Sequence, residues 1–204
     1  LQIPPNLMII DDSVFIECLS LEEIEIPSSV TSIGSYSFYN CSSLLEISIP
    51  SSVNEISYSA FFSCSSLEKV ELPPSITYIP EDGFCQCSSL TKITIPSSVD
   101  TIRKDAFNSC TSLEEIILPP TLTNISDYCF KNCSSLKKID LPSLKEINKS
   151  SFENCVSLTE IKIPNSVKII KEKAFCGCTS LEKITIDIFD IEIHETSFED
   201  CPSL

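Results

Sequence analysis

The stretch from Cys41 to Cys64 reads CSSLLEISIPSSVNEISYSAFFSC, and its second cysteine begins another copy of the same unit. Such cysteines recur every 23 residues along the chain, apart from one interval of 22 between Cys133 and Cys155. Each has a phenylalanine three residues before it, a serine two residues after it and a leucine three residues after it. A fixed period of this length is typical of a solenoid, because one unit is too short for a propeller blade or a pair of helices.

The pattern inside one unit predicts two short extended segments. Apolar and polar residues alternate over residues 46–49, as in a strand with one buried face. Pro50 ends this strand because it has no N–H for a continuing ladder, and the two serines after it form a corner. A second extended segment is expected near residues 53–56, followed by a tight helical turn over residues 59–63. One unit cannot bury its apolar edge alone, so parallel stacking is expected to align Phe on Phe and Cys on Cys.

The composition indicates one folded, acidic array over residues 1–204. We count about nine repeats, and because the chain starts part-way into a unit, we expect a fragment of a longer array. The net charge of −15 argues against nucleic-acid partners and anionic membranes. No apolar run is long enough for direct membrane insertion. Residues 1–68 contain no Lys or Arg, so either a basic protein partner is steered to that end or the acidic face is only solvated.

Two residue types that many active sites use, histidine and glycine, are scarce. His194 is the single histidine, which excludes a paired-histidine metal centre and leaves most catalytic triads dependent on one residue. Three glycines are too few for a phosphate-binding loop. We therefore expect no enzyme activity, no catalytic residue, no cofactor and no metal site.

Nine of the twelve cysteines form the periodic column, which we expect to serve as small apolar packing. Cys129 replaces the alanine of its unit and is expected in the core. Cys85 and Cys176 directly follow a phenylalanine, and we expect them to be exposed free thiols. They lie four coils apart and do not supply the four ligands of a typical zinc site. So many unpaired thiols favour a reducing compartment.

Two motifs resemble known repeats. The general pattern of the leucine-rich repeat superfamily appears as Leu21-Glu-Glu-Ile24-Glu-Ile26. The narrower pattern of the BspA-like, Treponema-type repeats appears as Ile95-Pro-Ser-Ser-Val99-Asp-Thr-Ile102, followed by Ala106-Phe-Asn-Ser-Cys110. Proline and serine follow the strand where many leucine-rich repeats have asparagine, so we do not expect an asparagine ladder there.

This resemblance covers essentially the whole chain and implies a leucine-rich repeat solenoid. We expect a right-handed coil of 23-residue repeats, with a parallel β-sheet on the concave face and short strands or 3-10 turns on the convex face. The resemblance also implies a non-enzymatic role in binding proteins, because relatives are often surface proteins for which adhesion is proposed. Fold alone does not determine function.

Two columns of side chains are expected to face outward on the concave sheet, five and seven residues after each periodic cysteine. We predict that binding involves Glu23, Glu25, Glu46, Lys69, Glu71, Lys92, Glu115, Ile117, Lys138, Asp140, Glu160, Lys162 and Lys183. Opposite charges adjoin at Glu46–Lys69, Lys92–Glu115, Glu115–Lys138, Lys138–Glu160 and Glu160–Lys183. The columns are either a mutually satisfied charge ladder, each pair contributing under about 1 kcal/mol, or a recognition face with Ile117 as an apolar anchor.

Two irregularities interrupt the pattern. The one-residue deletion near Pro142–Leu144 is expected to tighten a corner. In the last unit, Asp187 and Asp190 occupy the proline and valine columns, and we expect Ile188 or Phe189 to rotate into the core or Phe189 to be exposed.

Two function hypotheses follow. The first is a protein-interaction module of a surface or adhesion-type protein, located at the cell surface or secreted. The second is an intracellular scaffold or regulatory subunit that binds an enzyme such as a protein phosphatase, which fits the unpaired cysteines. Self-association through uncapped end coils is a third expectation, because such coils expose strand edges.

Overall fold

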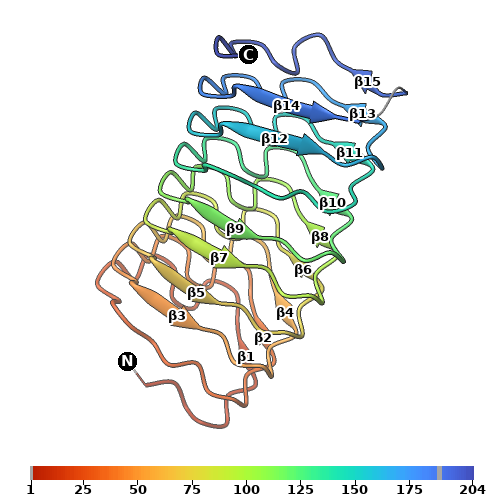
Figure 1. Cartoon of the computed structure of the whole chain (residues 1–204). Coiled ribbons are helices and arrows are strands. Elements are labelled where there is room, and N and C mark those ends of the chain that lie inside the picture. The colour runs from red at the N-terminus through yellow and green to blue at the C-terminus, as the bar shows by residue number, and fades with distance from the viewer. Residues whose placement is uncertain (1, 188–189) are drawn as a thin grey trace.

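The computed structural model describes residues 2–187 and 190–204, which form a stack of parallel coils (Figure 1). Each coil runs through a longer strand, a corner, a shorter strand and a turn segment before it enters the next coil. The described residues contain strands and turns and no helix. The predicted solenoid class is therefore confirmed. Our expectation for Ile188 and Phe189 lies outside the described residues.

The longer strands lie side by side on one face, which we call the long-strand face (Figure 1). They pair in parallel, with Glu46 opposite Lys69 and Lys92 opposite Glu115. Gln2 with Glu25 and Glu115 with Lys138 form isolated parallel bridges on the same face. The strands are β3 (Glu46–Ser48), β5 (Lys69–Glu71), β7 (Lys92–Thr94), β9 (Glu115–Ile117), β12 (Glu160–Ile163) and β14 (Lys183–Ile186).

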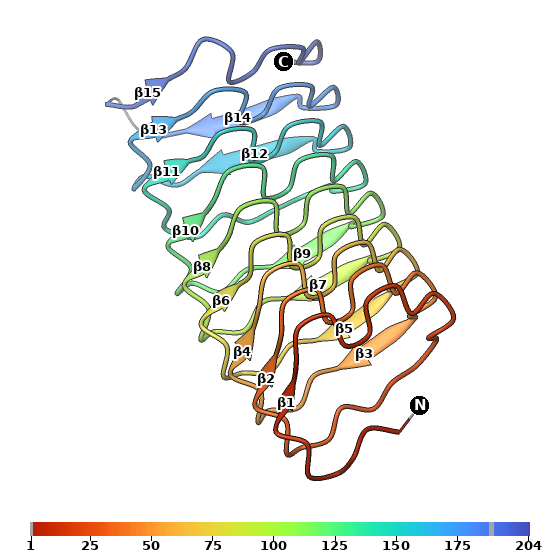
Figure 2. The same ribbon diagram turned by 180° about the vertical axis from the view of Figure 1, so that it is seen from behind.

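The shorter strands form a second face, seen best from behind (Figure 2). They occur where the sequence predicts a second extended segment, and they also pair in parallel. Each is two residues long, and in all but the last the second residue is a buried isoleucine. The strands are β1 (Ile9–Ile10), β2 (Ser32–Ile33), β4 (Glu55–Ile56), β6 (Tyr78–Ile79), β8 (Thr101–Ile102), β10 (Asn124–Ile125), β11 (Glu146–Ile147), β13 (Ile169–Ile170) and β15 (Glu192–Ile193).

The periodic phenylalanines form one internal file. Successive rings from Phe15 to Phe198 are stacked, with centroids 5.1 to 5.6 Å apart. The seven rings from Phe38 to Phe175 are fully buried. Inward isoleucines and leucines complete a continuous core between the faces. Each coil is thus stabilised by its neighbours, as the repeat pattern predicts.

The turn segments differ in detail from a 3-10 turn. In most coils the residues two before and two after the phenylalanine have left-handed φ, such as Ser59 at 52° and Ser63 at 58°. The N–H of Phe62 bonds the carbonyl of Ser59, and the N–H of Cys64 bonds that of Phe61. The segment is therefore a pair of successive β-turns, because a left-handed residue interrupts continuous helical winding. We call the surface formed by these segments the turn face.

The short-strand face breaks into three sheets at two irregular coils. In a regular coil the residue after the second strand donates its N–H to the coil before, as Ser57 does to Ile33 across 2.9 Å. Pro80 occupies this position after β6 and has no N–H to donate. Asn148 occupies it after β11, and there the side-chain amide donates to the carbonyl of Ile125 across 2.8 Å.

The one-residue deletion precedes Asn148 and tightens the corner, as predicted. In the regular coil before it, the N–H of Leu122 bonds the carbonyl of Pro119, three residues back. In the shortened coil, the N–H of Leu144 bonds the carbonyl of Pro142, two residues back and 2.7 Å away. The long strand of this coil is reduced to the bridge at Lys138.

Candidate binding surface

The long-strand face presents alternate side chains to solvent. In β3, β5, β7 and β9 the outer residues are exposed and the central residue is buried. All thirteen residues predicted for binding lie on this face and are exposed. Ile117 is 43% exposed, as expected of an apolar anchor. The structure thus brings the predicted residues together on one surface, and binding by them stays a prediction.

One of the five predicted cross-strand ion pairs is formed. Lys92 Nζ lies 2.7 Å from Glu115 Oε2. In contrast, Lys69 pairs with Glu71 at 2.8 Å, two residues along its own strand, and Lys138 pairs with Asp140 at 3.4 Å. These within-strand pairs form because residues two apart in a strand point to the same side.

The Lys69–Glu71 pair also shifts the proton affinity of both groups. Hydrogen bonding and charge attraction from Lys69 lower the pKa of the Glu71 carboxyl, and Glu71 raises the pKa of Lys69. Both side chains are well exposed, so the pair contributes little to stability.

Two shallow grooves adjoin on this face. The first has a volume of about 630 Å³ and is lined by the carboxylates of Glu23, Glu25, Glu46 and Glu71, with Lys69 as its one cation. The second has a volume of about 720 Å³ and is lined by Lys69, Glu71 and Lys92. Its apolar lining comprises Val70, Leu72, Pro74, Ile93 and Pro96. A partner on this face therefore meets an acidic groove beside a mixed one.

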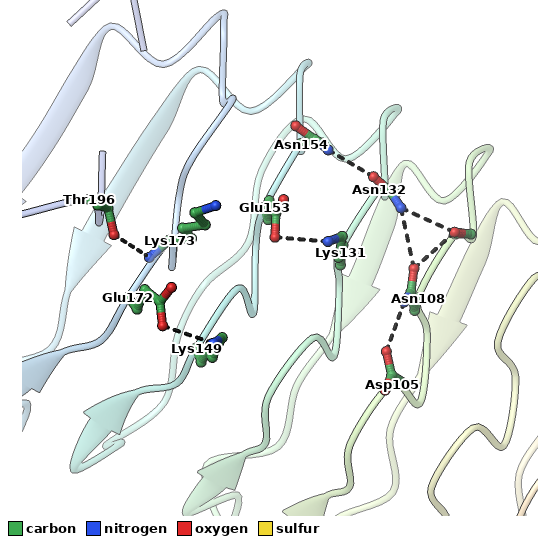
Figure 3. A network of polar contacts seen from close by, with 11 residues as sticks. Asp105, Asn108, Lys131, Asn132, Lys149, Glu153, Asn154, Glu172, Lys173 and Thr196 are labelled. Carbon is green, nitrogen blue, oxygen red and sulfur yellow. Dashed lines mark hydrogen bonds and ion pairs between the residues drawn. The ribbon is translucent and has the colours of Figure 1, made fainter. Parts of the chain in front are cut away.

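Polar side chains connect successive coils on the turn face in the C-terminal half (Figure 3). Asn154 Nδ2 donates to Asn132 Oδ1 across 3.0 Å, and Asn132 donates onward to Asn108 and Ser109. This asparagine ladder was not predicted, because the expectation for asparagine concerned only the position after the strand. The sequence signal for the ladder is an asparagine two residues after the phenylalanine, at Asn132 and Asn154. This position has left-handed φ, which asparagine tolerates well.

Ion pairs run beside the asparagine ladder. Lys131 lies 3.0 Å from Glu153, and Lys149 lies 2.8 Å from Glu172 (Figure 3). Each pair joins equivalent positions of neighbouring coils. The charges of these four side chains are therefore paired within the protein.

The cysteine column does more than fill space. From Cys41 to Cys201, each periodic thiol lies 3.1 to 3.2 Å from the carbonyl oxygen of a phenylalanine in the preceding coil and donates to it. Cys129 is buried, as predicted. The expectation that Cys85 and Cys176 are exposed was wrong, because they are only 5% and 8% exposed. All twelve cysteines are free thiols.

Serine hydroxyls bond the backbone at the turn into the strand, at the column two residues after each cysteine and at the position before it. In that column Ser203 donates to the carbonyl of Thr179 across 2.7 Å. Most such bonds come instead from the residue directly after the cysteine, as with Ser88 and Ser134. The hydroxyl one position earlier is the one that points back to the preceding coil.

Residues 2–187 and 190–204 contain no group of three or more His, Cys, Asp and Glu side chains placed to hold a metal ion. His194 is exposed, and its Nδ1 lies 3.0 Å from the hydroxyl of Thr196 in its own turn. In the same described ranges, no helix has the length and apolar character to cross a membrane.

The parallel coils and the internal Phe file define a leucine-rich repeat solenoid. The sequence pattern described as BspA type Leucine rich repeat region matches residues 1–110 and 77–204 in six copies, and the chain belongs to this family. Proteins of this fold are generally non-enzymatic scaffolds for protein interactions. No curated protein sequence matches the chain.

Several solved structures are similar to the chain. A leucine-rich repeat protein of T. pallidum is 31% identical, with 78% of each chain covered and a TM-score of 0.76. A leucine-rich repeat protein from Bacteroides ovatus is 25% identical, covering 100% of this chain and 70% of its own, with a TM-score of 0.62. The pneumococcal vaccine antigen PcpA is 19% identical, covering 94% of this chain and 62% of its own, with a TM-score of 0.50. At that identity PcpA shows the fold alone.

Proposed function

We propose that the chain is a non-enzymatic protein-interaction module whose long-strand face binds a protein partner, as part of a surface or adhesion-type protein. The observation that carries this proposal is the alignment of the thirteen predicted side chains, all exposed, on one face of stacked strands. Ile117 supplies an apolar contact among charges. The acidic groove at Glu23, Glu25 and Glu46 favours a partner that is basic at this end.

The alternative is an intracellular scaffold or regulatory subunit that binds an enzyme such as a protein phosphatase. The twelve free cysteines favour this alternative. However, ten of them are buried, which protects the thiols from oxidants in any compartment. Reduced thiols therefore fit both alternatives, and the choice between them needs a different test.

The chain has Asn-x-Ser glycosylation sequons at Asn40, Asn124, Asn132 and Asn148, and glycosylation separates the two compartments only at some of them. Asn148 is 5% exposed, and its side-chain amide donates to the carbonyl of Ile125, so the folded protein does not offer it to a glycosylating enzyme. Asn124 and Asn40 are half-buried. A glycan on either, detected by mass spectrometry of protein from its native cell, would support a secreted protein.

The binding test compares two isoleucines that are both 43% exposed, Ile117 in β9 and Ile193 in β15. The immobilised protein is offered extracellular-matrix proteins and, separately, cytosol from the producing cell. Capture that is lost with Ile117→Asp and kept with Ile193→Asp would support the long-strand face. Equal capture by wild type and Ile117→Asp would contradict it.

Self-association is a further proposal, supported by exposed apolar side chains in the coil nearest the N-terminus. Met8, Val14 and Leu19 are 56%, 51% and 54% exposed. Association through them would bury apolar surface. Sedimentation should show a mass that rises with concentration and returns to the monomer value with Val14→Glu and Leu19→Glu together. A strict monomer at high concentration would remove this proposal.

A further inference from the structure

Four aromatic side chains meet on the turn face of the N-terminal half. Tyr36 lies edge-on to Tyr58, with ring centroids 4.7 Å apart, and edge-on to Tyr39 at 5.7 Å. Tyr39 stacks on Phe62 at 5.0 Å with the rings nearly parallel. We call these four residues the aromatic cluster. Tyr58 is 48% exposed and the other three are half-buried, so the rings are accessible from solvent.

The repeat provides an internal comparison for this cluster. Tyr128 occupies the position of Tyr36, two residues before the phenylalanine of its coil. Around Tyr128, the positions of Tyr39 and Tyr58 hold Lys131 and Lys149. Lys131 Nζ lies 5.6 Å from the centroid of the Tyr128 ring, within the range of a cation–π contact. The two positions that hold lysines beside Tyr128 therefore hold tyrosines beside Tyr36.

The two sites also differ in how a nearby glutamate is paired. Glu172 pairs with Lys149 at 2.8 Å (Figure 3). Its equivalent two coils after Tyr36 is Glu81, whose backbone carbonyl accepts from the N–H of Ser59, the residue after Tyr58. Tyr58 stands where Lys149 would be, and among the described residues Glu81 forms no ion pair. The aromatic cluster therefore has a tyrosine and a nearby glutamate at the positions of Tyr128 and Glu172, but no lysine at the positions of Lys131 and Lys149.

The surroundings are mostly acidic, and the nearest cation on the turn face, Lys104 in the coil after Glu81, pairs with Asp105 at 3.7 Å. Residues 1–68 contain no Lys or Arg, and Lys69 lies on the long-strand face. Asp82 follows Glu81, and burial together with the charges of Asp105 and Glu81 raises its pKa, although the charge of Lys104 partly offsets this rise. A positive group placed here would relieve that repulsion.

Within the chain, a cation already stacks on a tyrosine of the coil before it. The guanidinium of Arg103 lies 3.6 Å above the centroid of the Tyr78 ring. A planar guanidinium can stack on an aromatic face and pair with a carboxylate at the same time. We propose that the aromatic cluster, together with Glu81 and Asp82, binds an arginine- or lysine-bearing segment of a partner protein.

This inference rests on the proposed function only in that the partner is a protein, since the cluster lies on the turn face and not on the long-strand face. It adds a second contact surface and gives the chemistry of what that surface takes. Asp12, one coil below, is exposed and accepts from the N–H of Ser35, so a third carboxylate borders the cluster from that side.

The test uses a fluorescent hexaarginine peptide titrated into the whole protein at physiological ionic strength, with binding followed by anisotropy. The net charge of −15 attracts any basic peptide, so the decisive variants leave charge unchanged. Tyr58→Ala should weaken binding about fivefold, the size of one cation–π contact. Tyr58→Phe keeps a ring and should bind within about twofold of wild type.

Tyr128→Ala is the matched control, because its site already holds its own lysines, and it should bind the peptide as wild type does. Equal binding by wild type and Tyr58→Ala would mean general charge attraction only and would overturn the proposal. An equal loss with Tyr128→Ala would overturn it too. Circular dichroism melting checks folding, which should be retained because the Tyr58 side chain is half exposed.

Two further arms separate other outcomes. Binding of a neutral oligosaccharide that is lost with Tyr58→Ala, without any response to hexaarginine, would assign the cluster to carbohydrate and overturn the inference. Ile117→Asp should bind hexaarginine like wild type. Loss of the protein partner with Ile117→Asp, but no effect of Tyr58→Ala on the peptide, would retain the proposed function and reject this inference alone.

Discussion

The thiol of Cys110 donates a hydrogen bond to the carbonyl oxygen of Phe84 in the preceding coil, across 3.1 Å. The bond links the two most regular columns of the repeat, because the same contact recurs from coil to coil. Alanine would leave the carbonyl with the N–H of Cys87 as its one donor, and valine would fill the space without supplying a second donor. The cysteine column is thus both packing and hydrogen bonding.

Native alkylation should modify few of the twelve thiols. Burial raises the pKa of Cys41 to about 11 and those of Cys85 and Cys178 to about 12, so almost no thiolate is present near neutral pH. Only Cys18 and Cys201 are partly exposed. After iodoacetamide treatment, intact mass should show at most two additions in buffer and twelve in urea. Rapid labelling of Cys85 would contradict its buried position.

Truncation in the phenylalanine file should be costly. Phe107→Ala removes a fully buried ring that stacks on Phe84 and Phe130 at 5.6 Å, and we expect a loss of about 3–5 kcal/mol in unfolding free energy. Urea denaturation followed by circular dichroism measures the loss. Phe62→Ala is the control, because this half-buried ring lies outside the file and should cost clearly less. Equal losses would mean that the file is no special source of stability.

The stability of the shortened coil should depend on the side-chain amide of Asn148. Asn148 donates to the carbonyl of Ile125 and accepts from Lys171 Nζ at 2.7 Å. Asn148→Ala should lower the unfolding free energy by about 1–3 kcal/mol, because a buried carbonyl loses its donor. At Ser126, one coil earlier, the backbone N–H makes the equivalent bond. Ser126→Ala should therefore be nearly neutral in the same urea melts, and a matching loss there would argue against the role of the Asn148 side chain.

The Lys69–Glu71 pair should be visible in a pH titration. The pKa of Glu71 is below the ordinary value for glutamate because Lys69 bonds and attracts its charged form. Its stabilising effect is present above the pKa of the unfolded chain and is lost as pH falls through the lower folded pKa. Carboxyl chemical shifts followed by NMR should give this low pKa in wild type and a higher one in Lys69→Gln. An unchanged Glu71 titration in the variant would exclude the within-strand pair in solution.

Repetition made the core predictable. Phe107 and Ile102 occupy columns that are apolar in every coil, so their burial follows from the pattern alone. The outward positions of Lys92 and Glu115 follow from strand alternation. The features that repeat in the sequence, the apolar columns and the strand alternation, are the ones on which the stacking of coils depends.

Features of single coils were harder to predict. Lys69 has Glu46 across the sheet and Glu71 along its strand, and the choice depends on side-chain rotamers that the sequence does not encode. Cys85 shares a column with polar residues such as Asn108, yet it is covered because its thiol is small enough for neighbouring turns to close over it. The amide of Asn148 takes the place of a backbone donor in the one coil that is a residue shorter, and no other coil in the described ranges shows this exchange as a pattern to learn from.

The 22-residue coil has a consequence for how the stack assembles. Identical coils could pair with the wrong neighbour, a slip that would leave most apolar contacts intact and give a folding array several near-equal arrangements. The Asn148 amide bonds the side chain of Asn124, the one asparagine in its column, as well as the carbonyl of Ile125. A stack that slipped by one coil would lose the contact with Asn124, so this coil should favour the native alignment of the array.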